Sequence, residues 1–194
     1  MDNEFTEREY SERSFKDINI SERCLKNIDF YNCKFTNCVF SECDFNGSES
    51  SECIFDHCSI SLSKFLNCSI RSAKFKDCKL VGVDLTRCTV NFFDLDFKKC
   101  LIDTCNFSTL PMKGTALEDC VIRECIFGET DLTRATFSGC DLEGSMFHNT
   151  KLNNADFTSA RNYTIDPVVN KVKGAQFSLP EAVSLLRGFD IKID

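Results

Sequence analysis

The stretch CKFTNCVFSECDF, residues 33–45, repeats every five residues. Phe35, Phe40 and Phe45 occupy equivalent positions, and a cysteine stands two residues before each of them. A helix returns to the same face every 3.6 residues and a strand every two, so neither element explains this period. A sustained period of five indicates a solenoid whose chain turns a corner at each repeat and directs one large and one small side chain inward.

The large position of this repeat can be followed along most of the chain. It is apolar from Leu25 to Val90 except at Ser50, which we interpret as a locally relaxed corner. After a two-residue slip, the pattern continues from Phe97 to Phe157. We expect the slip, within NFFDLDF at 91–97, to be an insertion that bulges from one corner without breaking the stack.

The residue types indicate how many repeats form one coil. If four repeats form a coil, equivalent positions of successive coils stack in columns. Two opposite columns are then mostly phenylalanine and the two between them mostly aliphatic. One phenylalanine column contains Phe35, Phe55, Phe75, Phe97, Leu117, Phe137 and Phe157. We therefore predict an all-β solenoid with four sides, about twenty residues per coil and about seven coils between residues 25 and 160.

All 14 cysteines except Cys24 occupy the small inward position. Stacked neighbours in a parallel ladder lie about 4.8 Å apart, farther than the roughly 3.8 Å between the Cβ atoms of a disulfide. We expect free thiols that pack as small apolar groups. No C-x-x-C pair occurs and His57 and His148 occupy outward positions, so we expect no metal site.

Composition excludes several functional classes. The net charge of −7 disfavours a nucleic-acid-binding surface. Neither a signal peptide nor an apolar run of spanning length is present, which predicts a cytoplasmic protein with no membrane contact. No nucleophile and base pair or glycine-rich phosphate loop can be identified, so we expect no enzymatic activity, no catalytic residues and no cofactor.

The two ends depart from the pattern. Residues 1–24 keep the large residue in phase but carry Arg8, Arg13 and Arg23 at the small position, where an unpaired guanidinium cannot be buried. This segment is either an irregular first coil or a cap that places Phe15 and Ile20 over the open end.

Residues 161–194 read as a C-terminal cap. A capping box of Ser178 and Glu181, Pro180 in the first turn and a stop at Gly188 predict a helix, with a short strand after it. The segment carries more apolar surface than capping one coil requires, which favours a two-fold dimer. The predicted dimerisation residues are Leu185, Leu186, Phe189, Ile191 and Ile193.

The repeat resembles that of the pentapeptide-repeat family, which centres on Leu or Phe with Ala, Cys, Ser, Thr or Val two residues earlier. This resemblance covers about residues 25–160 and implies a right-handed quadrilateral β-helix. The tail I-D-P-x-x-N-x-V-K-x-A-x-F-S-x-P-E-A-x-x-L-L-x-x-F-D-I-x-I, residues 165–193, resembles the C-terminal cap of the topoisomerase-interacting branch, which includes Qnr, MfpA and the albicidin and microcin immunity proteins.

That second resemblance implies a function. It implies a tail-to-tail dimer that resembles duplex DNA and binds DNA gyrase or topoisomerase IV, protecting them from quinolones or peptide toxins. The two longer projecting loops typical of Qnr are missing from this sequence. The alternative is a non-enzymatic scaffold that binds another protein, because fold alone does not fix function.

Charge is unevenly distributed along the predicted rod. Residues 25–117 carry no net charge, whereas residues 118–160 carry eight acidic and three basic residues. This acidic end is either an ordinary solvated face or a surface that contacts the partner. The candidate contacts are Glu118, Asp119, Glu124, Glu129, Asp131, Asp141 and Glu143.

The insertion supplies a second candidate contact. If the columns hold, Phe92 or Phe93 must point outward beside Asp94. An exposed aromatic residue there is either a contact for the partner or part of a bulge that folds back on the rod.

Overall fold

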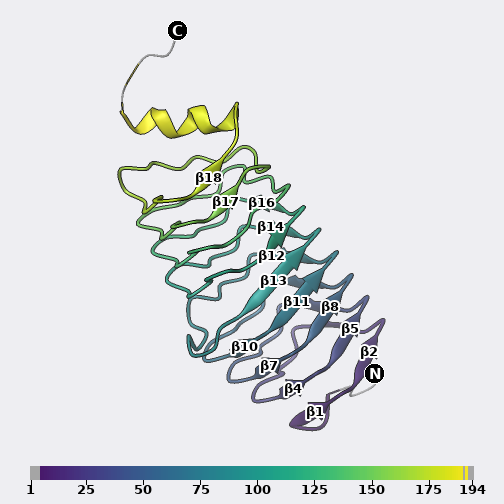
Figure 1. The fold of residues 1–194 in the computed structure, drawn as a ribbon. Coiled ribbons are helices and arrows are strands. Elements are labelled where there is room, and N and C mark those ends of the chain that lie inside the picture. Colours follow the sequence, from purple (N-terminus) through teal and green to yellow (C-terminus); the bar gives the residue numbers. More distant parts are fainter. Residues whose placement is uncertain (1–4, 190, 192–194) are drawn as a thin grey trace.

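The computed structural model describes residues 5–189 and 191. These residues form a parallel β-solenoid of about eight turns, which Figure 1 shows as a rod with the N-terminal coil at one end and a helix at the other. The prediction of a four-sided all-β solenoid is confirmed.

Three sides of the rod are parallel sheets, and single bridges connect the coils on the fourth. The first sheet contains β1 (Glu9–Ser11), β4 (Asp29–Tyr31), β7 (Glu49–Ser51) and β10 (Ser69–Arg71). The second contains β2 (Ser14–Lys16), β5 (Lys34–Thr36), β8 (Ile54–Asp56), β11 (Ala73–Lys76), β13 (Leu95–Lys98) and β15 (Leu117–Glu118). The third contains β3 (Asn19–Ser21), β6 (Val39–Ser41), β9 (Ser59–Ser61), β12 (Lys79–Val81), β14 (Leu101–Asp103) and β16 (Val121–Arg123). A short pair near the C-terminal end consists of β17 (Asp156–Phe157) and β18 (Gln176–Phe177).

The strand register confirms the predicted phenylalanine column. Phe35 pairs with Phe55, and Phe55 with Phe75, at ring-centroid distances of 4.8 and 4.7 Å. Beyond the insertion, Phe75 pairs with Phe97 and the column continues. Stacked rings fill the interior in the same way on successive coils, so burial of apolar surface drives folding along the whole rod.

The cysteines are free thiols, as predicted, and all are buried except Cys24. Their sulfurs donate hydrogen bonds to carbonyl oxygens of the preceding coil, as Cys78 Sγ does to Phe55 O at 3.3 Å. Burial raises the pKa of Cys68 to about 11, which keeps this thiol protonated at neutral pH.

The interpretation of Ser50 as a relaxed corner is wrong. Ser50 lies in the middle of β7, in register between Phe30 of β4 and Ile70 of β10. Because its side chain is too short to fill the interior, a cavity of about 70 Å³ remains, lined almost entirely by apolar groups such as Phe55 and Phe75.

The N-terminal segment forms a regular coil, since β1, β2 and β3 pair in register with β4, β5 and β6. The side chains of Arg8, Arg13 and Arg23 are exposed at this end of the rod. Arg13 pairs with Glu7 at 3.4 Å, and Phe5 covers the open interior. The ring of Phe5 contacts those of Tyr10, Phe15, Phe30 and Phe40.

The C-terminal helix is a 3-10 helix, η1 (Glu181–Phe189). It continues through Gly188 to Phe189, so the predicted stop is one residue early, and Phe189 belongs to the helix instead of the predicted strand. The Ser178 hydroxyl donates to the carbonyl of Thr158 in the last coils, so this side chain anchors the helix to the rod. Within residues 5–189 and 191, no helix has the length and apolarity needed to cross a membrane.

Candidate functional site

The acidic residues of the C-terminal half surround the rod. Asp119, Glu124 and Glu129 occupy three consecutive corners, where the backbone adopts φ values of 52°, 49° and 57°. Left-handed φ values are uncommon for residues other than glycine, and the corner position turns these side chains outward. We call the seven predicted acidic contacts, Glu118 to Glu143, the acidic band.

Four members of the acidic band form ion pairs. The pairs are Glu118 with Lys98 (2.6 Å), Asp131 with Lys151 (3.4 Å) and Lys113 (3.5 Å), Asp141 with Arg161 (3.2 Å), and Glu143 with Arg123 (3.8 Å). In the described part of the chain, no base lies within ion-pair distance of Asp119, Glu124 or Glu129. These three exposed carboxylates therefore remain available to a partner.

Asp141 has a structural role in this band. Its side chain is buried, and its carboxylate accepts a hydrogen bond from Asn162 Nδ2 at 2.8 Å and pairs with Arg161. Burial by itself would raise the pKa of Asp141, but the bond from Asn162 and the charge of Arg161 together lower it. The carboxylate thus links two coils of the solenoid.

The insertion places its two phenylalanines in opposite environments. Phe92 is 77% exposed and lies under the guanidinium of Arg71, 5.2 Å from the ring centroid, whereas Phe93 is 6% exposed. Val90, predicted to point inward, is exposed, so the register in this segment was misassigned and Phe93 contributes to the core instead. Asp94 accepts a hydrogen bond from the Ser72 hydroxyl at 3.1 Å.

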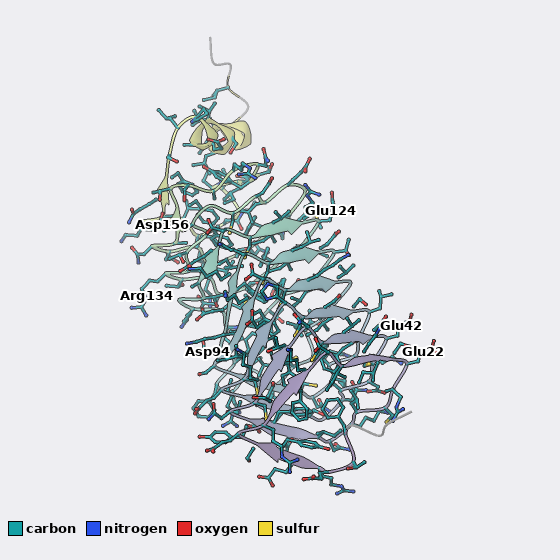
Figure 2. The ribbon with its side chains drawn as sticks, turned by 90° about the vertical axis from the view of Figure 1, so that its right-hand side faces the viewer. Glu22, Glu42, Asp94, Glu124, Arg134 and Asp156 are labelled. Carbon is teal, nitrogen blue, oxygen red and sulfur yellow. The ribbon has the colours of Figure 1, made fainter. Side chains whose placement is uncertain are left out.

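The insertion and the corner of Glu124 do not share a side of the rod. In Figure 2, Asp94 lies on one side of the rod, whereas Glu124 lies on the opposite side together with Glu22 and Glu42. A single flat partner surface cannot contact both sides of the rod at once.

The predicted dimerisation segment is apolar and largely exposed. Leu186, Phe189 and Ile191 are 38%, 53% and 56% exposed, and Leu185 is partly buried against the core. Ile193 lies outside the described residues. Two further exposed residues, Leu179 and Val183, extend this surface and were absent from the predicted set, although the helix pattern contained them.

One group of side chains offers ligand atoms that a metal could use. Among the described residues, Asp56, His57 and Asp77 bring their ligand atoms within 4.8 Å of one another. Lys34 lies 3.7 Å from Asp56, and Lys76 lies 3.8 Å from Asp77. These ammonium groups already balance the carboxylates, which disfavours a cation at this position.

Comparisons with known proteins agree with the fold. Two solved structures of trypsin-treated QnrB1 variants, a plasmid-mediated fluoroquinolone resistance protein, are similar in fold. One has a TM-score of 0.64 at 18% identity and covers 96% of this chain and 98% of that chain. The other has a TM-score of 0.54 at 20% identity, covering 96% and 99%.

A search of curated proteins found no significant match. The family model for the pentapeptide repeat region matches residues 28–91 and 83–157, which is more than half of the chain. The chain therefore belongs to the pentapeptide-repeat family.

Proposed function

We propose that this chain is a non-enzymatic cytoplasmic protein that binds a type II topoisomerase, DNA gyrase or topoisomerase IV, in place of DNA. The observation that carries the proposal is the acidic band, with the unpaired carboxylates of Glu124 and Glu129, close to an exposed apolar C-terminal helix. The resemblance of residues 165–193 to the cap of the topoisomerase-interacting branch supports the choice of partner.

The charge density of the band suits this role. Residues 118–160 carry eight acidic and three basic residues over about two coils, or roughly 10 Å at 4.8 Å per coil. Duplex DNA presents about six negative charges over the same length. A basic DNA-binding saddle would be attracted to both surfaces by the same long-range field.

Dimerisation places the band at the centre of the assembly. A two-fold contact through Leu186, Phe189 and Ile191 buries the exposed apolar end and joins two rods tail to tail. The two acidic bands then flank the junction, so the combined surface has approximately twice the length of one band. Modulation of the enzyme, or its protection from quinolones or peptide toxins, follows from occupation of its DNA-binding site.

Phe92 favours a second candidate function. Its ring is exposed and has Arg71 stacked on it. Phe92 stands two residues before Asp94, which Figure 2 shows on the side of the rod opposite Glu124. A scaffold that binds another protein through this aromatic contact would use the same fold with a different surface. The substitution Phe92→Ala distinguishes the two candidate functions. It should weaken binding of a scaffold partner but not of a topoisomerase, because it leaves the acidic band unchanged.

The experiment compares two double charge reversals in a gyrase supercoiling and cleavage assay, with and without a quinolone. Glu124→Lys/Glu129→Lys changes the acidic band, whereas Glu22→Lys/Glu42→Lys makes the same change in net charge at the far end of the rod. We expect wild type and the far-end variant to inhibit supercoiling at micromolar concentration and the band variant to be at least about tenfold weaker. If both variants inhibit supercoiling with equal potency, the proposal is contradicted. It is also contradicted if immobilised wild-type protein retains no gyrase in a pull-down.

A further inference from the structure

The cavity of about 70 Å³ beside Ser50 lies on the axis of the rod, and we call it the axial cavity. Residues from all four columns of inward side chains line it, and one complete coil surrounds it with Phe55, Ile60, Phe65 and Ile70. The acidic band contributes none of the described residues that line it. This site is therefore separate from the proposed topoisomerase contact.

The empty space is confined to the N-terminal half of the rod. Phe55 and Phe75 stack inside the rod, yet 9% and 7% of their surface is accessible. Phe137 and Phe157 belong to the same column and are 0% exposed. The difference agrees with the sequence, because only the N-terminal half has a serine, Ser50, at the large inward position. The accessible surface of Phe55 and Phe75 is therefore the wall of an internal space.

The axial cavity offers few polar groups to an occupant. Four of its lining residues carry side-chain oxygen atoms, and three of these have partners in the protein. The Ser48 hydroxyl donates to a carbonyl of the preceding coil at 2.9 Å, and Glu49 and Ser69 contact the guanidinium of Arg71 at 3.5 and 3.3 Å. The fourth is Ser50. Because a buried water needs about two to four polar partners, an apolar occupant is favoured over water.

The volume of the cavity sets the size of the occupant. An apolar cavity of about 150 Å³ in a protein core stays dry and binds benzene or xenon. The axial cavity has a volume of about 70 Å³, roughly half as much. Its occupant is therefore a molecule about half the size of benzene.

We propose that the axial cavity binds one small apolar molecule of the size of ethane. The rings of Phe55 and Phe65 and the side chains of Ile60 and Ile70 supply dispersion contacts that an empty space lacks. Ligands with two non-hydrogen atoms bind at best with dissociation constants on the order of 10 mM, and we expect a value of that order here.

Four isoleucines provide reporters for this site. Ile60 and Ile70 line the cavity, whereas Ile102 and Ile122 are fully buried in later coils and do not. The measurement is carbon–proton NMR of protein labelled at the isoleucine δ1-methyl groups, with ethane dissolved under pressure and nitrogen at the same pressure as the control. We expect ethane to shift the Ile60 and Ile70 signals to saturation and to leave those of Ile102 and Ile122 unchanged.

Methanol is the matched polar probe, because it replaces one methyl group of ethane with a hydroxyl. It should leave all four signals unchanged at the same concentration. Ser50→Ile fills the cavity and should weaken ethane binding at least about tenfold. Ser21→Ile places the same side chain on the exposed face of β3 and should bind ethane as the wild type does. Ser50→Ala removes the hydroxyl but keeps the space, so it should bind ethane at least as tightly as wild type.

The inference is overturned if ethane shifts all four methyl signals equally or if methanol binds as well as ethane. It is also overturned if Ser50→Ile keeps full binding, or if Ser50→Ala loses it. The comparison of the four methyl groups uses wild-type protein alone, so it decides the question even where a variant fails to fold.

Discussion

Filling the cavity at Ser50 should stabilise the rod. We choose Ser50→Ile because isoleucine already occupies the next position of the same column, at Ile70, and β-branched residues suit strands. The change replaces a hydroxyl with apolar atoms inside a space lined by Phe30, Phe55 and Phe75.

The size of the gain follows from the cavity. At about 24 cal/mol per Å³, eliminating 70 Å³ of empty volume is worth roughly 1.7 kcal/mol. Burial of the added carbon atoms contributes about 0.8 kcal/mol each, and strain from an imperfect fit opposes both terms by roughly 1–3 kcal/mol. We expect a net gain of about 2 kcal/mol, which raises the Tm by approximately 4–8 °C for a chain of this size.

Thermal and urea denaturation followed by circular dichroism measure this effect. Ser21→Ile is the matched control, because Ser21 is an exposed position in β3 and the change there fills no cavity. A Ser50→Ile protein with a native spectrum but no increase in Tm over wild type would show that the reasoning about the cavity is wrong.

Three further predictions concern other parts of the rod. In native protein, DTNB should react rapidly with one thiol, that of Cys24, and with all 14 in denaturant, because the other cysteines are buried. Asp141→Asn should cost about 1–3 kcal/mol at pH 7. Folding lowers the pKa of Asp141, so its carboxylate stabilises the protein above the unfolded pKa of about 3.9, and this stabilisation is lost as the pH falls through the folded pKa. The Tm difference between Asp141→Asn and wild type should therefore shrink below about pH 4. Gly144→Ala should lower the Tm because φ is +70° there, whereas Gly128→Ala, without a positive φ and with its nearest neighbour at 3.5 Å, should be tolerated.

The fold could be predicted because every coil uses the same inward positions. Once Phe35, Phe55 and Phe75 are assigned to one column, the side chains of all later coils follow from the period. The insertion could not be resolved in this way. The length of the insertion shows that the register is recovered at Phe97. It does not show which of Val90, Phe92 and Phe93 turns inward, because local packing decides which side chain enters the core.

The ion pairs of the acidic band were missed, although the sequence contained a signal. Glu118 and Lys98 are separated by 20 residues, as are Asp131 and Lys151, and these are stacked neighbours once the coil length is known. An acid and a base at that separation should be expected to pair. The position of η1 had no comparable signal, because it depends on contacts such as that between Ser178 and Thr158.

Because the coils stack in parallel register, the rod can change in length without any change in the direction in which its side chains face. Duplication of a whole coil would lengthen the rod and leave every stripe of side chains continuous. Gain or loss of a single five-residue repeat would instead rotate everything beyond it by a quarter turn, and the corner of Glu124 would move to a neighbouring side. The two-residue insertion avoids this rotation, since Phe75 still lies directly beside Phe97.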